Sequence, residues 1–369
     1  MRDVRGTRRV LAGLLALLLV VAACGQDDDG PVEEPDGAVE SGDDAAPDDT
    51  DEATEDEAAA DTEELEYEDF VYGQFGWHAD HWPVYIAQEE GLFDADDVRL
   101  NVEQLVPGDA RQFLPALLSG DMDIAVGGQL PFILQRMEGA DTVAVFSFRN
   151  TPSHRLVGTV PSLEEVEGGL VGVSAEVSAD GALTEMILDT VGLTLGEDYD
   201  FIVVGGTTDR AAALESGGIV AGLIGQPLDF GFVEREGMYD LGTTADYVSD
   251  FLWQGGQVTE AYAEENEEVL VRFLVAVLRA TEWFYDESNR DAAIEYLIQY
   301  TESEQDAAEQ TYDLFHEVRA FPDDLRPTVE SYENLLPVLE EGGELEDRDP
   351  PTAEEFFNLT FLDRALEAR

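Results

Sequence analysis

From residue 68 onward, short apolar segments alternate with amphipathic segments, and the alternation runs through the chain twice. The short segments show the apolar runs or the period-two alternation of strands, and the longer ones carry apolar residues at helical spacing. Strands separated by helices form crossover connections, which favour mainly parallel sheets with helices on their faces. We therefore predict an α/β fold with two such sheets. The strands are predicted at 70–73, 98–105, 124–126 and 143–148 in the first series, and at 170–174, 201–204 and 219–224 in the second.

The sequence becomes strongly helical after Val258, with extra C-terminal helices predicted over 260–285, 290–300, 304–318 and 327–340. Because the second series interrupts the first, we predict a discontinuous lobe 1, comprising 68–157 plus 251–369. The inserted lobe 2 is predicted at 158–250, and the two crossings between the lobes would serve as hinges. A cleft between such lobes, at the carboxyl ends of the strands, is a favoured small-molecule site.

The first residues of the chain are typical of an export signal. Four arginines lie before an apolar run at 10–23, which is too short for a stable transmembrane span. The run ends directly before Cys24, the only cysteine of the chain. This junction resembles the bacterial lipoprotein signal, which implies removal of residues 1–23 and lipidation of Cys24 on the extracytoplasmic face of the cell membrane. The alternative is an ordinary signal peptide with an incidental cysteine.

The segment that follows is dominated by acids. Residues 25–64 contain 19 Asp or Glu and no Lys or Arg, so they cannot build a core. We predict that 24–67 is a disordered, self-repelling tether that holds the folded body away from the membrane.

The net charge of the chain limits the classes of partner that it can bind. The chain has a net charge of −64 and contains no lysine. Nucleic acid binding needs basic contacts to phosphate, so we expect no nucleic acid partner. A surface this acidic suits high salt, where repulsion between carboxylates is screened, and we hold a high-salt habitat as a hypothesis.

The segment 75–93 resembles the opening of a family of bacterial solute-binding proteins. These proteins serve ABC importers for nitrate, sulfonates, taurine and the pyrimidine precursor of thiamine. The resemblance rests on Tyr85, Ala87, Gly91 and Phe93, and it continues in order to about residue 366. Further similar segments are 114–125, 128–140, 163–173, 210–217 and 351–366.

The sequence also departs from the family pattern at two places. Residues 219–221 lack the family's aspartate, and Gln226-Pro227 stands where the family has Asp-Pro or similar. The resemblance implies a two-lobed type II periplasmic-binding-protein fold, a small-molecule ligand, an ABC-transporter permease as partner and a monomeric state.

The loop after the first predicted strand is rich in rings. Trp77, His81 and Tyr85 could stack on a flat ligand or hydrogen-bond to it, although Tyr85 could equally pack into the core. His81 resembles in placement a histidine of the pyrimidine-precursor branch. His78 and His81, beside Asp80, could instead ligate a metal, but this spacing is common by chance and we predict no metal.

Two loops that precede helices are further candidates. Gly128 and Gln129 follow a strand and precede a helix opened by a proline, where backbone N–H groups can approach a ligand. Ser174 and Ser178 lie in the corresponding loop of lobe 2. Ser178 is also expected to cap the helix that begins at Ala179, which would occupy its hydroxyl.

The remaining candidates follow other strands or lie near a crossing. Arg149 could supply the counter-charge for a sulfonate or carboxylate, or it could pair with one of the many acids. Thr208 and Gln226 lie at strand ends of lobe 2, and Trp253, near the second crossing, could close over the ligand.

These observations predict a lipid-anchored, extracytoplasmic binding protein that delivers its ligand to an importer by cleft closure. The ligand is expected to be a pyrimidine-like heterocycle or a sulfonate- or nitrate-type anion. The alternatives are a metal-capture lipoprotein and an extracellular enzyme on the same fold. A eukaryotic relative of the family uses a lysine to hold pyridoxal phosphate and a cysteine cluster. This chain has neither, so we expect no cofactor, no catalytic residue and no enzyme activity.

The anchor can be tested directly. Cys24→Ala should release the protein from the membrane fraction, because two acyl chains, each contributing ~0.8 kcal/mol per CH₂, supply stable anchoring. Fractionation of cells that express either form measures this. Membrane retention that is unchanged in the variant would rule the anchor out.

Overall fold

The computed structural model describes residues 65–106, 110–175, 177–248, 250–341, 344–345 and 348–369. Cys24, the predicted signal segment and the tether up to residue 64 lie outside these residues. Within the described part of the chain, no helix has the length and apolar character needed to span a membrane.

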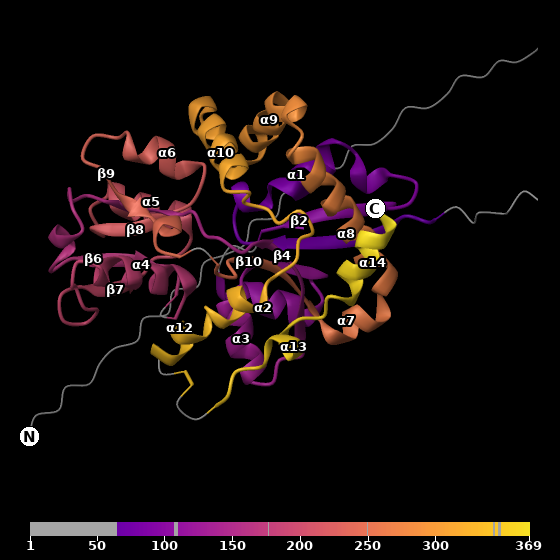
Figure 1. Cartoon of the computed structure of the whole chain (residues 1–369), viewed down its shortest axis with the longest axis horizontal. Helices are drawn as coiled ribbons and strands as arrows, with labels where there is room; N and C mark the ends of the chain where they lie inside the picture. Colours follow the sequence, from indigo (N-terminus) through magenta and orange to yellow (C-terminus); the bar gives the residue numbers. More distant parts are fainter. Residues whose placement is uncertain (1–64, 107–109, 176, 249, 342–343, 346–347) are drawn as a thin grey trace, which may run out of the picture. The chain divides into compact units, whose positions relative to one another are not determined.

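The first sheet has the strand order β2-β1-β3-β10-β4 (Figure 1). β1 pairs in parallel with β2 and β3, whereas β10 lies antiparallel between β3 and β4. Four of its five strands therefore point the same way. Its strands are β1 (Glu68–Gln74), β2 (Leu100–Leu105), β3 (Ile124–Gly128), β4 (Thr142–Arg149) and β10 (Gln254–Thr259).

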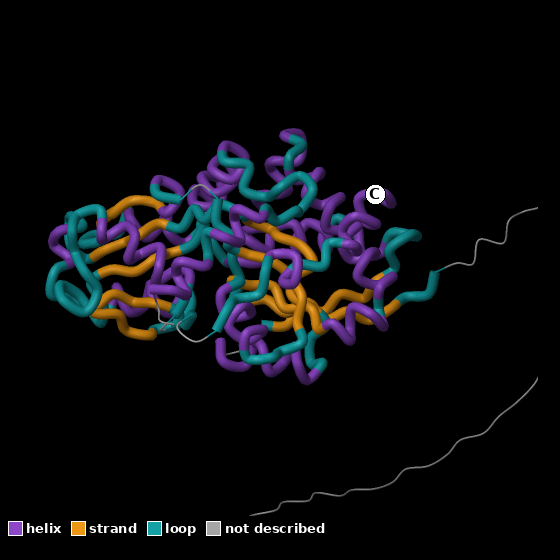
Figure 2. The backbone as a smooth tube through the Cα atoms, turned by 60° about the horizontal axis from the view of Figure 1, so that its bottom comes forward, coloured by secondary structure: helices purple, strands orange, loops and turns teal. Residues whose placement is uncertain are grey.

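The second sheet repeats this plan with the order β7-β6-β8-β5-β9. β6 pairs in parallel with β7 and β8, and β5 lies antiparallel between β8 and β9. Figure 2 shows the two sets of strands as separate groups. Its strands are β5 (Arg155–Gly158), β6 (Leu170–Val173), β7 (Asp200–Val203), β8 (Ala221–Ile224) and β9 (Tyr239–Thr243).

These sheets confirm the predicted α/β class with mainly parallel strands. The sequence pattern missed β5, β9 and β10. β5 follows β4 with no helix between them, β9 reads Tyr-Asp-Leu-Gly-Thr with few apolar residues, and β10 begins with Gln-Gly-Gly-Gln rather than an apolar run. The exact lobe boundaries stay a prediction, and β5 extends across the boundary at 157/158.

Helices follow most strands of both series. Those of the alternating part are α1 (Trp82–Glu89), α2 (Ala110–Ser119), α3 (Leu130–Met137), α4 (Ala179–Asp189), α5 (Thr207–Glu215) and α6 (Leu228–Val233). Short 3₁₀ turns are η1 (Ala79–His81), η2 (Leu92–Asp94), η3 (Glu164–Val166), η4 (Thr244–Asp246) and η5 (Glu287–Asn289).

The C-terminal part is helical as expected, but two of the long predicted helices are divided. The helix predicted at 260–285 breaks at Asn266, and the one at 327–340 breaks near Leu335. The helices are α7 (Glu260–Glu265), α8 (Glu267–Phe284), α9 (Arg290–Thr301), α10 (Gln305–Glu317), α11 (Val329–Glu333), α12 (Leu336–Glu341), α13 (Ala353–Phe356) and α14 (Thr360–Ala368).

α8 carries much of the core of the first sheet. Its Phe273 is fully buried and stacks on Phe70 of β1, with ring centroids 4.6 Å apart. Helices α1 and α14 pack against the same helix. Acidic residues in the first turn of α8, Glu267 and Glu268, complement the positive end of its dipole. A second buried cluster contains residues of both sheets together with Phe251 to Trp253, so the second crossing is part of the core.

The insertion of β10 between β3 and β4 needs glycine at Gly255. A Cβ there would lie 2.8 Å from the Phe146 carbonyl oxygen, which belongs to the backbone and cannot move aside easily. Gly255→Ala should therefore lower the free energy of unfolding by roughly 1–3 kcal/mol, measured by denaturant titration.

Gly231→Ala in α6 is the control, because a Cβ there meets nothing within 4 Å. We expect no loss of stability in this control. Equal losses in the two variants, or none at Gly255, would contradict the close approach.

Candidate ligand-binding cleft

A cavity of about 440 Å³ lies where strands of both sheets end. From the first sheet it is lined by Gly127 and Gly128 at the end of β3 and by Gln254 at the start of β10. From the second sheet it is lined by Ser174, just after β6, and Thr207, at the start of α5. Its volume falls within the roughly 300–1,000 Å³ typical of small-molecule sites.

Aromatic rings form much of the cavity wall. Phe113 lies between Phe75 and Phe132, with centroid distances of 6.3 and 6.2 Å. Near the crossings, the ring of His154 lies 4.5 Å from that of Trp253, and both line the cavity. A lining with two groups of rings suits a flat ligand, because stacking and edge contacts both add to area burial.

The hydroxyls that the sequence predicted in lobe 2 line the cavity but are already hydrogen-bonded. Ser178 caps α4 as predicted, since its Oγ accepts from Gly181 N at 3.2 Å and donates to Ala175 O at 3.1 Å. Ser174 donates its backbone N–H to Asp180 Oδ2 at 2.8 Å and its hydroxyl to Asp180 Oδ1. Asp180 therefore fixes the loop between β6 and α4.

The arginine that lines the cavity is balanced by a carboxylate. Arg210, on α5, is buried and its Nη1 lies 3.2 Å from Asp180 Oδ2. Its other contacts are to backbone: Nε donates to Leu223 O at 2.8 Å, and Nη1 donates to Gly205 O at 2.5 Å.

Arg149, predicted as a counter-charge for an anionic ligand, is fully buried and is not among the lining residues. It donates to Asp80 Oδ1, to Ser153 Oγ at 2.6 Å and to Thr151 O at 2.9 Å. Its guanidinium carbon lies 4.6 Å from the centre of the Phe315 ring. The charge of Arg149 is therefore paired with Asp80, and its remaining hydrogen bonds hold the first crossing, at residues 150–154.

Asp80 is the buried partner of several groups around the cavity. Beyond Arg149, its Oδ2 accepts from Trp253 Nε1 at 3.1 Å and lies 3.6 Å from His78 Nδ1. Burial alone would raise the pKa of Asp80. The charges of Arg149, His78 and His154, with the hydrogen bond from Arg149, outweigh burial and hold the pKa well below its usual range. Asp80 is therefore a carboxylate at neutral pH.

The predicted aromatic residues of the first loop form a stack outside the cavity lining. Tyr85 is fully buried and stacks on Tyr300 at 4.2 Å, and its hydroxyl donates to His78 O at 3.2 Å. Trp77 is 45 % exposed, with its ring centre 6.0 Å from Tyr85. His81 is fully buried with Nδ1 2.7 Å from the Tyr72 hydroxyl, and burial lowers its pKa well below its usual value.

The other predicted residues divide between the cavity and the interior. Gly128 and Trp253 line the cavity, whereas Gln129 is fully buried and links β3 to β10 by donating to Gly127 O at 2.7 Å and Gly255 O at 2.9 Å. Gln226 is nearly buried and bonds to Ser153. Thr208 is exposed, and its neighbour Thr207 lines the cavity instead.

Sequence reasoning did not select several lining residues. Phe113 and Phe132 occupy apolar helix positions that are typical of core residues. Arg210 follows a helix start in an alanine-rich segment, which gives no sign of burial. The lining residues outside the predicted set include Phe75, His78, Phe113, Phe132, His154, Asp180, Arg210 and Gln254.

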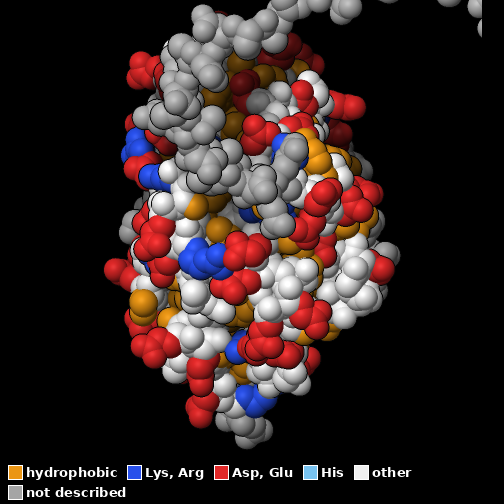
Figure 3. All heavy atoms as spheres, turned by 90° about the vertical axis from the view of Figure 1, so that its right-hand side faces the viewer, with side chains coloured by type: hydrophobic (Ala, Val, Ile, Leu, Met, Phe, Trp, Pro, Cys, Tyr) orange, Lys and Arg blue, Asp and Glu red, His pale blue; other side chains and the backbone are white. Residues whose placement is uncertain are grey.

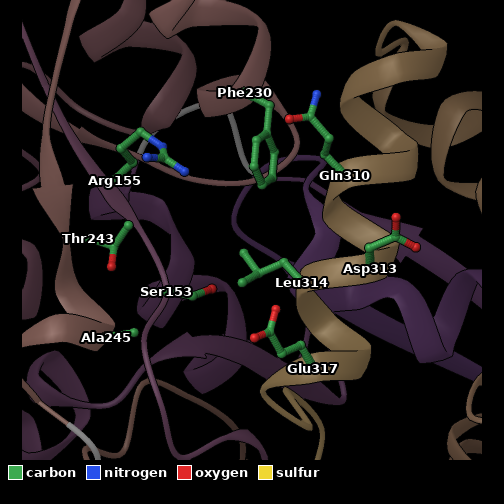
Figure 4. A pocket seen from close by; sticks show the side chains of 9 residues that line it. All are labelled: Ser153, Arg155, Phe230, Thr243, Ala245, Gln310, Asp313, Leu314 and Glu317. Carbon is green, nitrogen blue, oxygen red and sulfur yellow. The ribbon is translucent and has the colours of Figure 1, made fainter.

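A smaller hollow of about 290 Å³ lies between α10 and the second sheet (Figure 4). Leu314 and Glu317 of α10 point into it from one side, and Arg155 lies on the other. Arg155 is already paired with Asp229, through Nε at 3.2 Å, and with Asp240. We assign the ligand to the larger cavity, which has more rings and is formed by strand ends.

The described part of the chain contains no cluster of side chains suited to binding a metal ion. Among the described residues, no group of three or more His, Cys, Asp or Glu could hold a metal ion. The rings of His78 and His81 are 4.6 Å apart, but His81 Nδ1 is engaged with Tyr72 and His78 Nε2 lies 3.1 Å from Phe75 O.

Comparison with known proteins gives consistent matches. The family model described as NMT1/THI5 like matches residues 78–290. Over 246 residues the chain is 26% identical to the formylaminopyrimidine-binding protein of Halalkalibacterium halodurans, covering 65% of this chain and 72% of that protein.

Solved structures agree on the fold. The ligand-binding component of an ABC-type import system from Staphylococcus aureus, with zinc bound, superposes with a TM-score of 0.68 at 14% identity. That match covers 81% of this chain and 99% of the other. The alkanesulfonate-binding protein SsuA from Xanthomonas axonopodis pv. citri gives a TM-score of 0.57 at 18% identity, covering 70% and 96%. These likenesses establish a periplasmic-binding-protein fold.

The buried pair of Asp80 and Arg149 can be tested by removing first one charge and then both. Asp80→Asn leaves Arg149 buried without its carboxylate and should cost about 3–5 kcal/mol of unfolding free energy. Adding Arg149→Met should recover part of that loss, because it removes the unpaired charge. Because the pKa of Asp80 is lowered, its contribution is present above about pH 4 and is lost as acid protonates it. The wild type should therefore lose more stability in acid than the double variant.

Asp97→Asn is the matched control, since Asp97 forms an exposed bidentate pair with Arg279. It should cost less than about 1 kcal/mol. Denaturant titration at several pH values measures all four proteins. A loss at Asp80 no greater than that at Asp97 would refute the structural role assigned to the buried pair.

Proposed function

The chain belongs to the NMT1/THI5-like family, and we propose that it is a lipid-anchored, extracytoplasmic solute-binding protein that delivers a small flat nitrogen heterocycle to an ABC importer. Its general class, a solute-binding protein of ABC import type, follows from the family match and the fold. The pyrimidine-like ligand, the anchor at Cys24, the closure of the cleft and the lobe boundaries belong to the proposal.

The observation that carries the ligand class is the wall of the cavity. Phe75, Phe113 and Phe132 form one group of rings in this wall, and Trp253 is a further ring that lines the cavity. A planar heterocycle gains most from such walls, and the relative that matches at 26% identity is named for binding a formylaminopyrimidine.

Charge argues against a nitrate or sulfonate ligand. Arginine and lysine give these anions their charge-assisted hydrogen bonds, to which backbone N–H groups at helix N-termini can add. Arg210 faces Asp180 at 3.2 Å, and Arg149 is paired with Asp80 away from the lining, so each positive charge already has its carboxylate. Metal capture and extracellular catalysis find no specific supporting contact among the described residues.

The proposed mechanism uses the two crossings as hinges. In an open state the ligand enters from solvent and stacks on residues of both sheets. Rotation at the two crossings then buries it, and the closed form docks on the permease. The ligand favours closure only as far as it contacts both sheets, which the lining of the cavity allows.

A thermal-shift screen tests the ligand class. The panel contains 4-amino-2-methylpyrimidine, taurine, an alkanesulfonate and nitrate, each at millimolar concentration. We expect the pyrimidine alone to raise the melting temperature, because a ligand at 100 times its Kd stabilises the folded state by about 2.7 kcal/mol.

Trp253→Ala should abolish the shift, since it removes a ring from the cavity wall. Thr208→Ala is the control, because Thr208 is exposed and does not line the cavity. A shift with taurine, the sulfonate or nitrate and none with the pyrimidine would overturn the proposed ligand class.

A further inference from the structure

Two polar side chains that flank Trp253 are unsatisfied. His154 and Gln254 both line the cavity and are 6 % and 7 % exposed. His154 Nδ1 and Gln254 Oε1 are buried, and neither has a hydrogen-bond partner among the described residues. Other buried polar atoms of the described residues also lack partners, but these two belong to side chains that line the cavity, where a ligand can supply the missing partner.

The surrounding structure holds His154 against the ring of Trp253, and Gln254 follows Trp253 directly in the chain. Trp253 donates Nε1–H to Asp80, which fixes its indole, and His154 lies 4.5 Å from it. A Cβ at Gly225 would lie only 2.6 Å from His154 Nε2, so glycine at that position makes room for the imidazole. The backbone of Gln254 is held by β10, where its carbonyl accepts from Ser147 Oγ at 3.0 Å.

The chemistry of the two side chains is complementary. Burial lowers the pKa of His154 to about 3, so its neutral imidazole offers one donor and one acceptor. The carboxamide of Gln254 offers both kinds of group, and its last torsion is soft enough to turn either one toward a ligand. Its Oε1 can be satisfied only by a donor.

We propose that His154 and Gln254 are specificity-determining residues, which select a ligand whose ring edge carries an N–H donor next to a nitrogen acceptor. In this arrangement Trp253 supports the face of the ring, while Gln254 Oε1 accepts from the exocyclic amine and His154 pairs with the ring nitrogen. Nitrate and sulfonates carry acceptors only and leave Gln254 Oε1 unpaired. This inference rests on the proposed function, and it identifies the side chains that distinguish one ligand from another.

The test compares two probes of nearly equal size, 4-amino-2-methylpyrimidine and 2,4-dimethylpyrimidine, by isothermal titration calorimetry on the full chain. The wild type should prefer the amino compound by about 10-fold or more, which corresponds to one hydrogen bond. Gln254→Leu and His154→Phe should each reduce this preference severalfold, toward equal binding. Gln254→Glu keeps the acceptor and should retain the preference.

Gln257→Leu is the matched control. Gln257 lies on the same strand, is fully buried and also has an unpartnered Oε1, but it does not line the cavity. This variant should keep the preference for the amino compound. Equal binding of the two probes to the wild type overturns the inference without any variant. A preference in the wild type is assigned to these side chains by Gln254→Leu and His154→Phe, with the conservative Gln254→Glu as the variant that keeps it.

The outcomes separate the two proposals. If neither probe binds the wild type, the proposed function fails and this inference fails with it. If both probes bind with equal affinity, the inference fails while the pyrimidine-binding function stands. An undiminished preference in folded Gln254→Leu and His154→Phe would equally overturn it.

Discussion

The buried pair of Asp80 and Arg149 connects the parts of the chain that the candidate site depends on. Asp80 lies in the turn after β1, and its carboxylate binds both Arg149 at the end of β4 and Trp253 in the second crossing. Arg149 in turn holds Ser153 of the first crossing, and Ser153 bonds to Gln226 at the end of β8. Both crossings and the tips of both sheets are therefore tied to one carboxylate. In a buried setting such a pair is costly to break from one side only, which makes the arrangement specific.

The pairing of buried arginines with aspartates also decides which chemical groups the cavity offers to a ligand. The chain is strongly acidic, and Figure 3 shows Asp and Glu side chains spread over one face with few arginines among them. Arg210, which lines the cavity, and Arg149, which lies behind it, are each paired with an aspartate. Once these charges are balanced, rings and neutral donors and acceptors define what the cavity can bind. An anionic ligand would also approach against the field of a chain with a net charge of −64.

Much of the fold could be predicted from the sequence, because strands and helices place their apolar residues at different and recognisable spacings. The antiparallel strands β5, β9 and β10 could not, since β10 owes its place to close packing at Gly255 and Gly256 rather than to an apolar pattern. The site was predicted only in part. Gly128, Ser174, Ser178 and Trp253 line the cavity, while Gln129 and Gln226 are occupied by bonds between segments distant in sequence. Hydrogen-bond partners of this kind leave no local signal.

The sequence by itself determined the class of fold and the family resemblance, and it pointed to strand ends for the candidate site, since these follow from periodicity and from turns that neighbouring residues encode. Only the tertiary structure decided which polar groups remain available to a ligand. Arg149 and His154 are both polar residues near the first crossing. Arg149 is paired with Asp80, whereas His154 keeps an unpaired nitrogen beside the cavity. That difference depends on partners brought together by folding, with Asp80 distant from both in sequence, and no local pattern could reveal it.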